Sequence, residues 1–134
     1  MIAGGEAVIF HGHARLTGDV DFFFDRDPRN TRRLFAALRE FWGGEAPGIA
    51  SAADLEQAGL VLQYGVPPNR IDLLNDIDGV SFGEAWAGRV EAVTAGDSGD
   101  VALPYLGRTE LIRNKEASGR PRDLDDLSYL RRQG

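Results

Sequence analysis

The chain contains 134 residues with a formal net charge of −6, and 43% of its residues are hydrophobic. This length predicts one domain, residues 1–134, and the acidic charge argues against a broad surface that binds nucleic-acid phosphates. The lack of cysteine excludes disulfides and thiolate catalysis, and the lack of a long apolar run or a charged leader argues against a membrane span or secretion, so we expect a cytoplasmic protein.

The first half of the chain alternates between apolar stretches and turn residues, which indicates strands and helices in succession. Asp27 and Pro28 favour a helix start, since aspartate caps free N–H groups and proline suits the first helical position. Gly43 and Gly44 are expected to end that helix. The expected elements are a strand end at 1–3, a helix at 6–11, a strand at 20–24 and an amphipathic helix at 28–42.

The second half predicts a hairpin, short helices, weak strands and two closing helices. Ser51 with Asp54, and Ser81 with Glu84, have the spacing of capping boxes. The expected elements are helices at 51–58 and 82–87, hairpin strands at 60–64 and 70–74, weak strands at 90–93 and 101–103 around a loop at 96–100, and helices at 108–117 and 121–131. Together they predict an α/β or α+β fold, with a small mixed sheet flanked by helices.

Three acidic residues lie in strand-like segments. Asp19 and Asp21 stand two residues apart before an apolar run, so their side chains point to the same face. Asp72 is flanked by apolar residues in the expected hairpin, which would place it beside the first two acids. Carboxylates gathered on core strands repel one another and lose water, and a divalent cation such as Mg²⁺ offsets both costs.

Each of these acids also has a simpler interpretation. Asp19 and Asp21 could be an acidic pair near a turn on an edge strand. Asp76 and Asp78 are near enough to compete with Asp72 for the third position, although they fall in an expected turn. We favour Asp72 because its apolar neighbours indicate a buried strand.

Two further features predict contacts to phosphate. Gly4 and Gly5 precede a helix, so their backbone can approach a phosphate closely and the helix offers free N–H groups, although an ordinary glycine turn is the alternative. Lys115 is the single lysine among fifteen basic residues. It supplies either a compact point charge for a triphosphate or a solvated position on a helix face, and the sequence does not separate these two.

Other polar residues receive weaker predictions. We do not expect His11 or His13 to form a zinc site, because further ligands at tetrahedral spacing are lacking. Arg15 and Thr17 either line the nucleotide site or pack within a loop. Asp123 is expected to cap the last helix.

The combination of Gly4-Gly5, Asp19-Val20-Asp21 and the later Asp72 resembles the signature of the DNA polymerase β-like nucleotidyltransferase superfamily. Within it, these residues and the stretch from Leu111 to Leu127 are similar to a small bacterial branch. That branch includes AbiEii-type toxins of toxin–antitoxin systems and minimal stand-alone nucleotidyltransferases. The resemblance covers nearly the whole chain.

This resemblance implies a nucleotidyltransferase-like fold and transfer of a nucleoside monophosphate from an NTP, such as ATP, to a hydroxyl of a tRNA, a protein or a small molecule. It implies Mg²⁺, or alternatively Mn²⁺, as cofactor. It also implies a cognate toxin or antitoxin protein as a partner, and a homo-oligomer is a further expectation, while a membrane is not. The implied catalytic and metal-binding residues are Asp19, Asp21 and Asp72, and the implied nucleotide-binding residues are Gly4, Gly5 and Lys115.

Two other functions stay open on the sequence. Glu6 places a negative charge beside the expected phosphate contact, and only a short stretch precedes Gly4, which together motivate a non-catalytic binding module with the same fold. A metal-dependent phosphohydrolase would use the same three acids.

Overall fold

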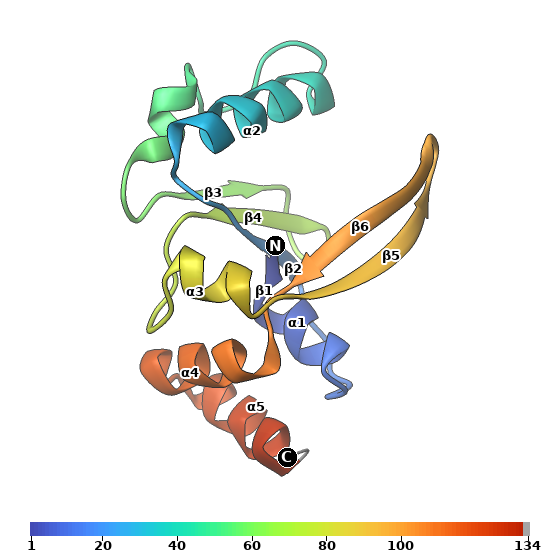
Figure 1. Ribbon diagram of the computed structural model, residues 1–134, viewed down its shortest axis with the longest axis vertical. Coiled ribbons are helices and arrows are strands. Elements are labelled where there is room, and N and C mark those ends of the chain that lie inside the picture. Colours follow the sequence, from blue (N-terminus) through green and yellow to red (C-terminus); the bar gives the residue numbers. More distant parts are fainter. Residues whose placement is uncertain (133–134) are drawn as a thin grey trace.

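A six-stranded mixed sheet with strand order β3-β4-β2-β1-β6-β5 organises the molecule (Figure 1). The structure, a computed structural model, describes residues 1–132. The strands are β1 (Ile2–Ala3), β2 (Asp19–Phe23), β3 (Val61–Tyr64), β4 (Arg70–Leu74), β5 (Val90–Gly96) and β6 (Gly99–Tyr105). The helices are α1 (Gly4–Phe10), α2 (Pro28–Phe41), the 3₁₀ helix η1 (Ala52–Glu56), α3 (Phe82–Ala87), α4 (Arg108–Ser118) and α5 (Pro121–Arg132). The expected small mixed sheet flanked by helices is confirmed.

Strand β2 lies near the middle of the sheet, antiparallel to β1 and parallel to β4. The parallel register places Asp19 opposite Arg70 and Asp21 opposite Asp72. Strands β3 and β4 form the antiparallel hairpin that was expected from the sequence. The parallel pairing of β4 with β2 brings Asp72 beside Asp19 and Asp21, as predicted.

Helices cover both faces of the sheet, and two hydrophobic clusters fill the layers between. Consecutive residues of a strand point to opposite faces, so Phe23 joins one cluster and Phe22 packs against the other, which also contains Phe24 just after β2. The Phe23 cluster includes Val8, Leu111 and Leu130, from α1, α4 and α5. Figure 1 shows α2 and η1 on one side of the strands, with α4 and α5 on the other.

Local signals explain several helix ends. The Asp27 side chain accepts the Arg29 backbone N–H at 2.9 Å, and Pro28 occupies the first helical position of α2, as expected. Ser81 and Glu84 form the expected capping box at the start of α3. Ser51 and Asp54 also form a capping box, but the segment that follows is a short 3₁₀ helix and not the α-helix expected at 51–58.

Two other elements differ from the sequence expectation. Helix α1 begins at Gly4, two residues earlier than expected. The weak strands around a loop at 96–100 are wrong in extent, because β5 and β6 have seven residues each and meet at a two-residue turn between Gly96 and Gly99. Gly99 has a φ of +116°, which glycine adopts at little cost. None of the helices described in residues 1–132 is long and apolar enough to cross a bilayer.

Candidate functional site

Three carboxylates meet on adjacent strands. Asp19 and Asp21 come from β2 and Asp72 from β4, and one oxygen of each lies within 4.8 Å of the others. The residues lie on the same face of the sheet because strand side chains alternate and the two strands are paired in register. Their predicted convergence is confirmed. The competing residues Asp76 and Asp78 follow the end of β4 and are not part of this group.

The charges of the group are poorly compensated at Asp21. Burial, followed by the negative charges of Asp19 and Asp72, raises the pKa of Asp21 from 3.8 to about 6. Its Oδ1 atom is buried without a hydrogen-bond partner. A cation at this position would satisfy that oxygen and reverse the repulsion, and carboxylate oxygens are the ligands that Mg²⁺ prefers. The residues present therefore fit a divalent cation.

Arg70 compensates the other two acids. Its Nη2 atom donates to Asp19 Oδ2 at 2.7 Å and to Asp72 Oδ2 at 3.1 Å. Its Nε atom lies 3.0 Å from Asp72 Oδ1, but the N–H is not directed at that oxygen, so Asp72 Oδ1 has no hydrogen-bond partner. Arg70 thus holds Asp19 and Asp72 in place by charge, and one oxygen of Asp72 is left without a hydrogen bond.

Our sequence predictions did not include Arg70. The signal was present, because Arg70 stands two residues before Asp72 and therefore on the same face of β4. Only the pairing of β4 with β2, however, places the guanidinium beside Asp19.

Gly4 and Gly5 make room for the side chains of the site. Gly4 has a φ of +59°, and a Cβ atom there would lie 2.1 Å from Asp21 Oδ2. A Cβ atom on Gly5 would lie 2.7 Å from Thr17 Oγ1, which donates to Asp19 Oδ1 at 3.1 Å. A side chain at either position would therefore collide with Asp21 or with the Thr17 hydroxyl that supports Asp19, and at Gly4 the positive φ also favours glycine. Contact of this backbone with a nucleotide stays a prediction.

Two hollows of about 460 and 280 Å³ adjoin the carboxylates. Their linings share Gly4, Asp19, Asp21, Lys115 and Arg120. The smaller hollow adds mainly cationic and small side chains, among them Gly5, Arg15, Thr17 and Arg122, together with the acid Asp123. The larger one adds acidic and amide side chains, among them Gln63, Asp76, Asp78 and Asn114. Asp19 and Asp21 thus lie between a more basic hollow and a more acidic one.

Lys115 is buried, so its alternative placement on a solvated helix face is wrong. Its side chain is 4% exposed, and its Nζ atom lies 2.9 Å from Asp123 Oδ1 and 3.1 Å from Asp126 Oδ2. Burial acts to raise the pKa of Asp123, but hydrogen bonds from Arg120, Lys115 and Ser118 outweigh it and hold that pKa well below its usual range.

Asp123 also accepts the Arg120 backbone N–H at 3.1 Å, at the start of α5. The expected capping role of Asp123 is thus confirmed, and its carboxylate additionally anchors Lys115. The single lysine therefore ties α4 to α5 next to the two hollows.

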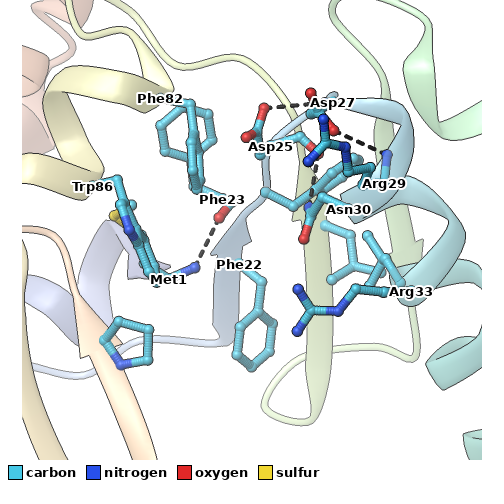
Figure 2. A pocket seen from close by; sticks show the side chains of 14 residues that line it. Met1, Phe22, Phe23, Asp25, Asp27, Arg29, Asn30, Arg33, Phe82 and Trp86 are labelled. Carbon is cyan, nitrogen blue, oxygen red and sulfur yellow. Dashed lines mark hydrogen bonds between the residues drawn. The ribbon is translucent and has the colours of Figure 1, made fainter.

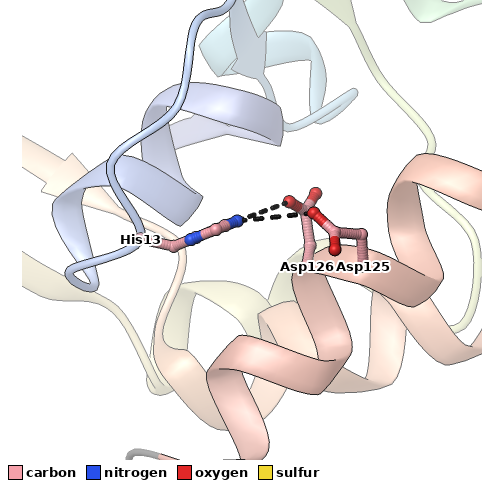
Figure 3. A group of neighbouring side chains, drawn as sticks. All are labelled: His13, Asp125 and Asp126. Atoms are coloured by element: carbon pink, nitrogen blue, oxygen red, sulfur yellow. Dashed lines mark ion pairs between the residues drawn. The ribbon is translucent and has the colours of Figure 1, made fainter.

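A second polar cluster, formed by His13, Asp125 and Asp126, is shown in Figure 3. It adjoins Lys115 through Asp126. His13 Nε2 lies 3.6 Å from Asp125 and 3.9 Å from Asp126, and the imidazole stacks on Tyr129 with ring centroids 4.4 Å apart. Asp126 is fully buried and accepts two hydrogen bonds from Arg15, at 2.8 and 3.0 Å. The charge of Asp126 is already compensated by Arg15 and Lys115, so this cluster is poorly suited to a metal ion.

A larger hollow, of about 850 Å³, lies elsewhere, between α2 and α3 where β2 ends (Figure 2). Most of its lining is apolar, including Phe22, Phe82 and Trp86. Its two acids are engaged with the backbone, since Asp25 accepts the Asp27 N–H at 3.1 Å and Asp27 caps α2. Buried carboxylate oxygens without a hydrogen-bond partner, those of Asp21 and Asp72, distinguish the hollows beside the three acids, and we place the candidate chemistry there.

Comparisons of this chain with protein-family models, with curated proteins and with solved structures gave no match.

Proposed function

We propose that the protein is a Mg²⁺-dependent nucleotidyltransferase, which transfers a nucleoside monophosphate from an NTP to a hydroxyl group. The observation that carries this proposal is the group of Asp19, Asp21 and Asp72 on paired strands, with one oxygen of each within 4.8 Å of the others and with buried oxygens of Asp21 and Asp72 that have no hydrogen-bond partner. Hydrophobic side chains of the same strands pack on both faces, so the carboxylates are held by a rigid scaffold.

The reaction needs the attacking oxygen, the phosphorus and the leaving oxygen to be held in line, and it needs the negative charge of the phosphate oxygens to be neutralised. The acceptor oxygen bonds to the α-phosphorus, the bond from that phosphorus to the bridging oxygen breaks, and pyrophosphate leaves. Asp19, Asp21 and Asp72 would hold the cation, and Asp72 would also accept the proton of the attacking hydroxyl. When bound, Mg²⁺, or Mn²⁺, supplies the positive charge that neutralises the phosphate oxygens.

The charges around the acids suggest which hollow each substrate enters. The more basic hollow, with Arg15, Arg120 and Arg122, suits a triphosphate, and the Gly4-Gly5 backbone adjoins it. The hydroxyl acceptor then enters from the hollow lined by Asp76 and Asp78. Lys115 adds positive charge to both, although a direct bond to phosphate would require its ammonium to exchange one of its carboxylate partners.

Calorimetric titration of each NTP with Mg²⁺ tests this proposal. Wild-type protein should bind at least one NTP only when Mg²⁺ is present, and Asp19→Asn/Asp21→Asn should abolish that heat. The double variant Asp76→Asn/Asp78→Asn removes the same charge from the neighbouring turn and should retain metal-dependent binding. Equal loss in both variants would show that net charge, and not the three-acid group, is responsible.

A non-catalytic binding module with this fold is the second candidate. Arg70 already neutralises two of the acids and Lys115 is already paired, which reduces the charge left for a nucleotide. No heat with any NTP, from folded protein, together with stable association with a cognate toxin or antitoxin protein, would favour this function.

Transfer can also be separated from hydrolysis. With a radiolabelled NTP, label appearing on added tRNA, on a protein or on a small hydroxyl compound identifies the acceptor class. Release of inorganic phosphate without any labelled acceptor would instead indicate a phosphohydrolase that uses the same acids.

A further inference from the structure

The β5–β6 hairpin extends beyond the rest of the sheet with little protein around it (Figure 1). Val93 is 67% exposed, Val101 47% and Val90 41%, although valine favours a packed strand. An isolated two-stranded hairpin is at best marginally stable in water. The hairpin therefore has exposed apolar side chains, and pairing with a further strand would stabilise it.

The outer edge of β5 offers free backbone groups. Pro104 faces Glu91 in the ladder and has no N–H, so the hydrogen-bonded pairs must be the alternate ones, such as Val90 with Tyr105 and Ala92 with Leu103. The residues between them, Glu91, Val93 and Ala95, then direct their N–H and C=O groups away from β6. β5 is the last strand of the sheet, so within residues 1–132 these groups meet no other strand.

Edge strands are commonly protected by lysine, proline or a bulge. The seven residues of β5 include neither lysine nor proline, and their register with β6 is continuous. The other edge of the hairpin differs, because Pro104 interrupts the donors of β6 on the side of β1. Of the two edges of this hairpin, the β5 edge is thus the one open to strand addition along its full length, and its seven residues make it longer than the four-residue β3 at the opposite edge of the sheet.

We propose that two copies of this chain associate through antiparallel pairing of β5 with β5 of the partner subunit, about a twofold axis at Val93. In this register Val93 faces its own copy, and Glu91 faces Ala95 of the partner subunit. The same register brings Arg89, just before β5, opposite Asp97 of the partner subunit, just after β5, at both ends of the pairing. Arg89 now pairs with Glu91 at 2.9 Å, so an ion pair across the axis would share or replace that contact. Moving the axis to Glu91 would set two glutamates opposite each other, and moving it to Ala95 would run the pairing into the turn.

This inference does not depend on the proposed function. The axis lies on the hairpin, whereas the carboxylates lie on β2 and β4. Dimerisation and nucleotide transfer can therefore fail separately.

Cysteine cross-linking tests the register directly, since the natural chain contains no cysteine. Cα atoms of a hydrogen-bonded antiparallel pair lie about 5.5 Å apart, within the roughly 4.4–6.8 Å that a disulfide spans. Val93→Cys should form a disulfide-linked dimer under mild oxidation. Val101→Cys, exposed on the neighbouring strand, is the matched control and should remain monomeric on a non-reducing gel.

A mixture gives a second test of the same register. Glu91→Cys and Ala95→Cys should each cross-link poorly alone, and they should cross-link efficiently when the two proteins are mixed. Equal cross-linking of Val93→Cys and Val101→Cys, or no gain on mixing, would overturn the proposed pairing.

Sedimentation measures the association without cross-linking. Wild-type protein at roughly 100 µM should sediment with a mass approaching twice the chain mass of 14.6 kDa. Val93→Lys brings like charges together at the axis and should weaken association at least about tenfold. Circular dichroism verifies that this variant is folded. A wild-type protein that stays monomeric, or a folded Val93→Lys protein that dimerises normally, contradicts the proposal.

Discussion

Replacing Asp21 with asparagine should stabilise the metal-free protein at neutral pH while removing metal binding. Asp21 is ionised at pH 7.5 at a cost, because burial and the charges of Asp19 and Asp72 raise its pKa from 3.8 to about 6. Asparagine has nearly the same shape and no charge, and its amide N–H can donate to Asp72. The substitution therefore removes the repulsion and keeps the packing.

The sign of the pH effect follows from proton linkage. The folded protein holds the Asp21 proton more tightly than the unfolded chain, so wild-type stability falls as the pH rises from about 4 through about 6. A shift of roughly two pKa units corresponds to about 3 kcal/mol, and partial solvent exposure reduces this to about 1–2 kcal/mol. The Asp21→Asn protein should thus melt about 3–6 °C higher than wild type at pH 7.5 and at the same temperature near pH 4.

Thermal unfolding in EDTA between pH 4 and 8 measures this difference. Asp100→Asn, on the exposed hairpin, removes one charge away from the site and should show no comparable gain. Addition of Mg²⁺ should then raise the melting temperature of wild type and leave Asp21→Asn unchanged. If Asp21→Asn is less stable than wild type at pH 7.5, or if its advantage does not depend on pH, the electrostatic reasoning is refuted.

Two further substitutions test how the site is supported. Gly4→Ala should lower the free energy of unfolding by about 2–4 kcal/mol, because a Cβ at a φ of +59° would lie 2.1 Å from Asp21 Oδ2. Gly43→Ala, at a φ of +75° with no atom within 4 Å, should cost only about 1–2 kcal/mol in the same denaturant titration, and equal costs would argue against the contact. Lys115→Met should cost about 3–5 kcal/mol because the buried Asp126 loses one of its cations, and a loss below about 1 kcal/mol would show that the pair is dispensable.

The amino-acid sequence alone was sufficient for features that depend on near neighbours. Asp27 and Pro28 mark the start of α2 because the cap accepts an N–H only two residues away. Strand alternation places Asp19 and Asp21 on one face, whatever lies next to the strand. The 3₁₀ geometry of η1 and the length of the β5–β6 hairpin were less predictable, since competing backbone pairings decide both.

The tertiary structure decided which distant residues complete the site. Arg70 reaches Asp19, 51 residues away in the chain, only because β4 pairs in parallel with β2. Arg15 reaches Asp126 across 111 residues because α5 packs beside the loop before β2. Ion pairs of this kind follow from packing of whole elements, and the spacing of residues along the chain carries no information about them.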